Sequence, residues 1–205
     1  MAEVRTVLAV GAHPDDLELG CGATLAKLVR GGVRVRALVL TEGVAGAAAG
    51  QDRCTETRAA LGALGVDDLH QARLPDTGLP GAIAEAVRLL EVQCRELRPD
   101  RVYTMFKDDR HQDHRAVYEA CMVACRGVPQ LLGYETPSSW PNYVPSVFEP
   151  VDDLLERKIA ALRFHASQRQ RSYMDPGQIR CSARFRGQQV GLGPCEGFIP
   201  YRMVL

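Results

Sequence analysis

Residues Thr6 to Gly22 read TVLAVGAHPDDLELGCG. The first five residues form a short apolar run that ends at Gly11. Such a run predicts a buried strand. A polar loop comes next, and leucine and valine then recur at helical spacing over 20–29 until Gly31-Gly32 ends the pattern. A strand that leads through a polar loop into a helix is the opening unit expected of an α/β fold.

The alternation of apolar runs and amphipathic segments continues along the chain. Further strands are predicted over 33–40, 68–74, 101–104 and 131–135. Further helices are predicted over 52–64 (capped by Asp52), 81–98, 114–126 and 152–168, whereas residues 41–50 are expected to be a loop and 182–205 stay unassigned. This pattern predicts an α/β chain, as one domain over 1–205, with a Rossmann-like three-layer fold and a mainly parallel sheet.

Composition limits the kinds of partner. The 205 residues include 25 basic and 25 acidic side chains and are 46% hydrophobic, so a folded core is expected and no nucleic acid is indicated. No apolar run approaches the ~20 residues that span a bilayer. Without a membrane span or a signal-like N-terminus, a cytoplasmic location is predicted. Whether the chain forms a homo-oligomer stays open.

Two other compositional features have simple interpretations. The seven cysteines lack Cys-x-x-Cys spacing, so they are expected to be free thiols in a reducing compartment. An arginine-rich stretch over 163–186 is interpreted as a solvated face.

Side chains suited to chemistry follow two of the predicted strands. His13, Asp15 and Asp16 come after the first strand, and His111 and His114 come after the fourth. If these two strands are neighbours, both loops open into one crevice at the carboxyl ends of the strands. Two histidines and one carboxylate are a common ligand set of catalytic zinc, which keeps a further position for water.

Residues within each loop can have different chemical roles. One of Asp15 and Asp16 can bind a metal while the other acts as a general base toward the attacking water. His111 and His114 lie three residues apart on one helix face, so one can bind the metal while the other donates to a developing oxyanion. Asp113 can hold a histidine in one tautomer without binding the metal itself.

The run Ala12-His-Pro-Asp-Asp-Leu-Glu-Leu-Gly-Cys-Gly22 resembles the signature of the PIG-L or LmbE-like deacetylases. His111-Gln-Asp-His114 resembles the family's second motif, which is usually His-Pro-Asp-His. Matches within 158–168 and 184–198 extend the resemblance over nearly the whole chain, although 191–195 lacks the usual apolar and aromatic run. The resemblance implies a metal-dependent enzyme that removes acetyl groups from N-acetylglucosaminyl substrates.

The resemblance also implies roles for residues of this chain. His13, Asp16 and His114 are the implied ligands of Zn²⁺, with Fe²⁺ or another divalent ion left open because such sites are weakly selective. Asp15 is the implied general base. His111 is the implied oxyanion donor or acid, oriented by Asp113. The implied substrate-binding residues are Arg53, Arg110 and Asp76.

Other interpretations stay open beside this one. The same amide hydrolysis on a non-sugar metabolite is the nearest alternative. A metal-binding protein without catalysis is less favoured, because a closed structural site has no use for the spare carboxylate of Asp15. A nucleotide-binding module is disfavoured, since two aspartates stand where phosphates would bind and no Gly-x-Gly-x-x-Gly follows the first strand. The expected partner is therefore a small N-acetylated molecule.

Overall fold

The computed structural model describes residues 3–48 and 50–204. The ends of the predicted domain and residue 49 of the predicted loop lie outside this description. The strands are β1 (Thr6–Gly11), β2 (Arg34–Val39), β3 (Asp68–Gln71), β4 (Arg101–Met105), β5 (Gln130–Tyr134), β6 (Val147–Pro150) and β7 (Cys195–Met203). Within the described residues they form one sheet in the order β3-β2-β1-β4-β5-β7-β6. The first five strands in this order are parallel, and β7 runs antiparallel to both β5 and β6.

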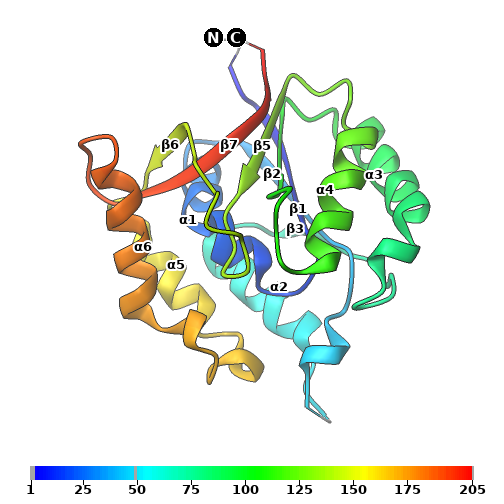
Figure 1. The fold of residues 1–205 in the computed structure, drawn as a ribbon, viewed down its shortest axis with the longest axis horizontal. Coiled ribbons are helices and arrows are strands. Elements are labelled where there is room, and N and C mark those ends of the chain that lie inside the picture. The colour runs from blue at the N-terminus through cyan, green and yellow to red at the C-terminus, as the bar shows by residue number, and fades with distance from the viewer. Residues whose placement is uncertain (1–2, 49, 205) are drawn as a thin grey trace.

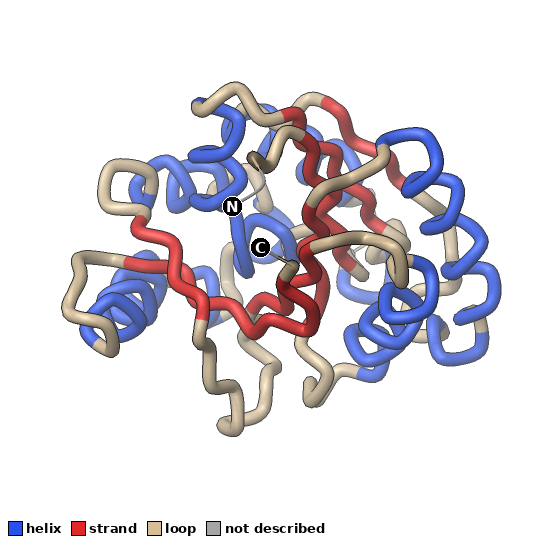
Figure 2. The backbone as a smooth tube through the Cα atoms, turned by 90° about the horizontal axis from the view of Figure 1, so that it is seen from above, coloured by secondary structure: helices blue, strands red, loops and turns tan. Residues whose placement is uncertain are grey.

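Helices cover both faces of the sheet (Figures 1 and 2). They are α1 (Asp16–Arg30), α2 (Arg53–Leu64), α3 (Ile83–Leu97), α4 (Gln112–Ala124), α5 (Leu155–Leu162) and α6 (Pro176–Gln188). Short 3₁₀ turns are η1 (Val44–Gly46), η2 (Leu79–Gly81), η3 (Ala166–Gln168) and η4 (Ser172–Met174). Helices α3 and α4 pack together on one face, whereas α1, α2 and α5 pack together on the other, with α6 against α5. The predicted α/β class with a mainly parallel sheet and helices on both faces is confirmed.

Strand β1 lies where the strand order reverses. It pairs in parallel with β2 and with β4, and Val7 lies opposite Val35 on one side and Arg101 on the other. Because β1 and β4 are neighbours and parallel, the loops that follow them open at the same edge of the sheet. The crevice expected from the sequence is therefore present, and it separates the start of α1 from the start of α4.

Helix α1 begins at Asp16, four residues before the prediction. It is buried on almost every side from Asp16 to Ala26, so it lacks the alternation of apolar and polar residues that marks a half-exposed helix. The helix also bends at Cys21, whose φ of −143° and ψ of 16° are not helical.

A buried ion pair satisfies the backbone groups freed by this bend. The carboxylate of Glu196 accepts hydrogen bonds from the N–H groups of Ala23 and Thr24, at 3.2 and 2.7 Å. The ammonium of Lys158 donates to the carbonyl of Leu19 and to Glu196, at 2.6 and 2.7 Å. Residues from α5 and β7 therefore cap the two halves of α1 at the bend, since each half ends in unpaired peptide groups.

The C-terminal segment that the sequence left unassigned contains most of α6 and all of β7. Helix α6 buries only Ile179, Ala183 and Gly187, which is too few apolar positions to give a clear helical pattern. Strand β7 contains Pro200, which sits beside a register shift in its pairing with β5. A proline within a run argues against a strand, but it is tolerated where pairing is irregular.

Each of the seven cysteines has a free thiol, and the sulfur atoms of Cys94 and Cys125 lie 3.7 Å apart. Across residues 3–48 and 50–204, the helices are all too short or too polar to cross a membrane.

Gly20 brings the backbone of α1 against the ring of Tyr134. A Cβ at this position would lie 2.1 Å from Cδ2 of that ring. Tyr134 is fully buried and its hydroxyl donates to the carbonyl of Val10 at 2.8 Å, so the ring has nowhere to move. We expect Gly20→Ala to lower the free energy of unfolding by about 1–3 kcal/mol, measured by urea denaturation. Gly127→Ala is the control, because a Cβ there meets no atom within 4 Å. Equal losses in both variants would contradict this packing.

Candidate metal centre

The loop after β1 turns sharply so that two adjacent carboxylates face different ways. Asp15 adopts a left-handed backbone with φ of 99°, which costs a residue with a side chain on the order of 1–3 kcal/mol and is typical of functional sites. The carboxylate of Asp16 folds back over the loop and accepts the N–H groups of Ala12 and His13, at 3.0 and 2.7 Å. The loop is therefore fixed by one of the residues that it presents.

The loop after β4 leads directly into α4. His111 caps this helix, because its Nδ1 accepts the N–H of Asp113 at 3.2 Å. The N–H of His111 donates in turn to Asp109, at 2.8 Å. The cap places Asp113 and His114 in the first turn of α4, one and two residues after the helix start at Gln112.

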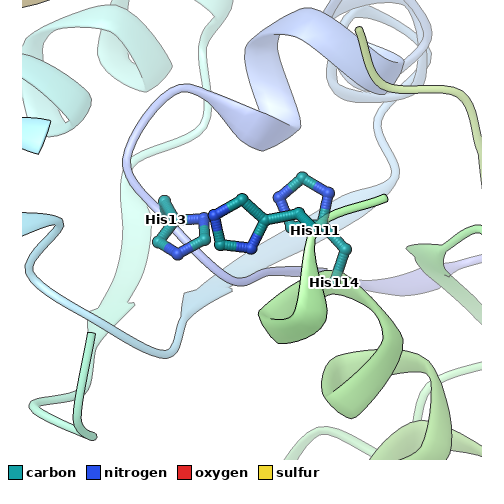
Figure 3. A group of neighbouring side chains, drawn as sticks. All are labelled: His13, His111 and His114. Atoms are coloured by element: carbon teal, nitrogen blue, oxygen red, sulfur yellow. The ribbon is translucent and has the colours of Figure 1, made fainter. Parts of the chain in front are cut away.

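Three imidazole rings meet between the two loops (Figure 3). The ring centroid of His13 lies 4.7 Å from that of His111 and 5.4 Å from that of His114, and the last two are 4.8 Å apart. One nitrogen from each ring lies within 4.8 Å of the others. This spacing is compatible with ligands that share one metal ion.

The ring of His13 has carboxylates at both of its nitrogens. Its Nδ1 lies 3.5 Å from Asp16, whereas its Nε2 lies 3.0 Å from Asp113 and 3.3 Å from Asp76. Asp113 is completely buried and accepts two further N–H groups from residues 77 and 79. Asp113 therefore holds His13, and not the ring of His111 as the sequence predicted. The reason is that His111 turns its Nδ1 onto the backbone of α4 to cap the helix.

His114 repeats the arrangement of His13. Its Nε2 lies 3.3 Å from Asp16, and its Nδ1 lies 3.1 Å from the buried carboxylate of Asp109. A histidine whose second nitrogen is held by a carboxylate is the usual form of a metal-binding histidine. The sequence analysis missed Asp109, because an aspartate in the polar loop 107–112 looks the same as a solvated one.

The centre is built for a cation. Burial alone would lower the pKa of His13, but its aspartate partners raise it to about 12. Burial opposes a charge on His114 as well, yet its carboxylate neighbours raise its pKa to about 9. Burial also opposes the negative charge of Asp16, but the two histidines hold its pKa well below its usual range. A buried group of carboxylates needs positive charge. A divalent ion bound by the histidine nitrogens that face Asp16 fits this need.

His111 differs from the other two histidines. Burial lowers its pKa, and the neighbouring charges of His114 and His13 lower it further. Within residues 3–48 and 50–204, the only hydrogen bond that its ring makes to a protein group is the cap on the N–H of Asp113. The lowered pKa favours the neutral form of the ring, which lies on the cavity between the two loops.

Asp15 lies beside Asp16 and the histidines but has a separate partner. Its carboxylate is 3.2 Å from the guanidinium of Arg53. Burial and the charge of Asp16 raise the pKa of Asp15 to about 7, against the opposing effect of Arg53. The same guanidinium donates to the carbonyls of Gly43 and Pro14, at 3.1 and 2.5 Å. Arg53 therefore braces the loop after β1.

These residues line one cavity of about 440 Å³, called here the metal-centre cavity. The other two predicted substrate-binding residues also line it. The carboxylate of Asp76 accepts the N–H of Ala45 at 2.6 Å besides contacting His13. Arg110 is more exposed and lies over the ring of Trp140. The structure thus brings every predicted site residue to one cavity, with Asp113 lying behind His13.

Comparison with known proteins gives a consistent match. A sequence model of the PIG-L family, described as GlcNAc-PI de-N-acetylase, matches residues 8–125. The deacetylase YaiS of Escherichia coli is 46% identical over 169 residues, covering 80% of this chain and 91% of YaiS. Diacetylchitobiose deacetylase of Thermococcus kodakarensis is 28% identical over 228 aligned residues, covering 97% of this chain and 84% of that protein. The crystal structure of a conserved protein of Thermus thermophilus matches with a TM-score of 0.84 at 27% identity. The match covers 99% of this chain and 97% of the Thermus protein.

Proposed function

The chain belongs to the PIG-L family of deacetylases, and we propose that it removes the acetyl group from an N-acetylglucosamine-type sugar conjugate, using Zn²⁺ held by His13, Asp16 and His114. The observation that supports this ligand set is the position of Asp16. Its two oxygens face one nitrogen of His13 and one of His114, and the opposite nitrogen of each ring is held by a buried carboxylate. Two histidines and one carboxylate leave a catalytic zinc open to substrate.

A ligand set of three histidines is less well supported. His111 lacks the carboxylate partner that the other two rings have among the described residues, and its Nδ1 is used by the helix cap. A neutral imidazole beside the ligands suits a hydrogen-bond donor in catalysis better. We therefore assign His111 to the substrate and not to the ion.

When bound, the zinc ion supplies Lewis acidity toward the acetamide carbonyl and the attacking water. Asp15 lies at the same cavity wall, and its raised pKa of about 7 suits a group that takes a proton near neutrality. His111 donates a hydrogen bond to the oxygen on which negative charge develops. Asp15 or His111 then returns a proton to the leaving amine. The carboxylate of Asp15 needs no covalent bond to the substrate in this sequence of steps.

The substrate assignment is tested with a panel of N-acetylglucosaminides that differ in aglycone, together with N-acetylated amino acids and polyamines. Release of free amine is the measured quantity. We expect release from the sugars. Release only from the non-sugar compounds would show that the substrate is another small metabolite. The assignment of the site residues would then still hold.

The two carboxylates behind the histidines are expected to affect metal affinity. Asp109→Asn and Asp113→Asn should each weaken zinc binding by about 10–100-fold, because each loses the charge that holds its histidine. The measurement is zinc competition against a chromophoric chelator. Asp108→Asn is the control, since that side chain is more exposed and, among the residues that the structure describes, contacts only Asn142 and Lys107. Wild-type affinity in both test variants would show that these carboxylates do not support the metal.

A further inference from the structure

Two arginines line the metal-centre cavity without a carboxylate partner. Arg110 and Arg171 both lie on its wall. Within residues 3–48 and 50–204, neither guanidinium has a carboxylate within 4.0 Å, whereas the third arginine of this cavity, Arg53, is paired with Asp15. The other acidic side chains of the cavity do not pair with these arginines, because Asp16 and Asp76 contact the ring of His13 instead. The two arginines therefore add positive charge that the protein does not neutralise.

Arg110 is held in place by neutral groups. Its Nε donates to the carbonyl of Ser138 at 3.1 Å, and its Nη2 donates to the carbonyl of Pro137 at 3.0 Å. Its guanidinium carbon lies 5.9 Å from the ring centroid of Trp140. These contacts fix the side chain but leave its charge uncompensated. An ordered guanidinium loses less conformational entropy when it binds an anion than a free one does.

The backbone that carries Arg171 is also fixed. Its N–H donates to the carbonyl of Gln168 at 2.9 Å. The buried side chain of Gln168 donates to the carbonyl of Gly46 at 3.0 Å and accepts the hydroxyl of Tyr173 at 3.1 Å. The turn between η3 and η4 is thus tied to the loop after β2. The side chain of Arg171 is exposed, in keeping with the solvated face expected from the sequence, and it lies on the cavity wall.

A second cavity of about 530 Å³ adjoins the first one. The residues that line both cavities are Leu19, Arg110, Pro137 and Tyr173. The other cations of this second cavity are paired, Lys158 with Glu196 at 2.7 Å and Arg186 with Glu135 at 2.6 Å. Arg110 belongs to both cavities, and Arg171 directly precedes residues 172 and 173 of the second one. The unpaired positive charge is therefore concentrated where the two cavities join.

We propose that the substrate carries an anionic substituent, a phosphate ester or a carboxylate, which Arg110 and Arg171 bind at this junction. The substituent belongs to the part of the substrate that keeps the amine, and this part extends from the metal centre into the second cavity. This inference rests on the proposed deacetylation and specifies its substrate class. Guanidinium groups suit both kinds of anion, because their N–H donors match carboxylate and phosphate oxygens.

The test compares kcat/KM for N-acetylglucosamine, N-acetylglucosamine 6-phosphate, N-acetylglucosamine 1-phosphate and N-acetylmuramic acid. Comparing the two phosphates with the carboxylate shows which kind of anionic substituent the enzyme prefers. We expect at least one anionic substrate to be preferred over the neutral sugar, and the preference to shrink as the salt concentration rises. Arg171→Gln should reduce the ratio of anionic to neutral kcat/KM by about 10–100-fold, the usual effect of losing a charge-assisted hydrogen bond. Arg169→Gln, an exposed arginine outside this cavity, should leave the ratio unchanged.

Two results would overturn the inference: equal kcat/KM for the neutral and all the anionic sugars, or an unchanged ratio in Arg171→Gln. Failure of the proposed function is recognised separately, as absence of amine release from every sugar. In that case, calorimetric titration with the same sugar phosphates and N-acetylmuramic acid decides the inference. Tighter binding of an anionic sugar to the wild type than to Arg171→Gln supports the junction as an anion site, and equal binding rejects it.

Discussion

Asp15→Asn is expected to keep the bound metal and to lose turnover by about 10²–10⁴-fold, the usual effect of removing a general base. The amide occupies nearly the same volume as the carboxylate but cannot take a proton from the attacking water. Asp15 contacts Arg53 and not the nitrogens that face the ion, so metal binding should persist. The measurements are kcat with the best acetylated substrate and zinc content of the same preparation.

A fold control is needed for this variant, because it leaves the buried guanidinium of Arg53 without its carboxylate. The two carbonyl bonds of Arg53 remain in the variant, and thermal unfolding reports any loss of stability. Asp67→Asn, at an exposed position just after the C-terminal end of α2, serves as the matched substitution with wild-type activity expected. Full activity in a folded Asp15→Asn protein would exclude Asp15 as the base and would favour a different proton acceptor.

His13→Ala and His114→Ala are expected to lose both the metal and the activity. Each removes one nitrogen facing Asp16 and leaves a buried carboxylate, Asp113 or Asp109, without its imidazole partner. Loss of a buried ion-pair partner is destabilising by about 3–5 kcal/mol, so stability should fall as well. Metal content is measured on protein that circular dichroism shows to be folded.

His70→Ala is the control for these two variants, since His70 is half-buried on β3 and its ring pairs only with Asp68 within the described part of the chain. It should keep wild-type metal content and turnover. Full zinc occupancy in folded His13→Ala and His114→Ala proteins would remove both residues from the ligand set.

The sequence predicts the fold best where each element carries a local signal. The helix over 52–64 is an example, because Asp52 accepts the N–H groups of residues 54 and 55 as its cap and Gly65 ends it with a φ of 91°. Helix α1 begins earlier than its pattern suggests, since a helix buried on all sides has no amphipathic face to reveal it. Strand β7 is stabilised by pairing with two distant strands, and no local pattern reports such pairing.

The site shows the same division between local and distant information. The two histidine motifs could be found because their residues are adjacent in sequence and follow strands. Asp109 could not be found, because its importance comes from its contact with His114 and with Thr136 of another loop. The contact between Asp113 and His13 could not be predicted from the sequence either, since His13 lies 100 positions away in the chain. The buried pairing of Arg53 similarly depends on a loop that the sequence does not place.

The most direct test of the metal centre compares zinc content in Asp16→Asn and His111→Ala. These variants separate the proposed ligand set from a set of three histidines, which the ring spacing also allows. We expect about one zinc ion per chain in the wild type and in His111→Ala, with reduced turnover in the latter, and loss of zinc from folded Asp16→Asn protein. Zinc retained by Asp16→Asn and lost from His111→Ala would contradict it and would assign the ion to the three histidines.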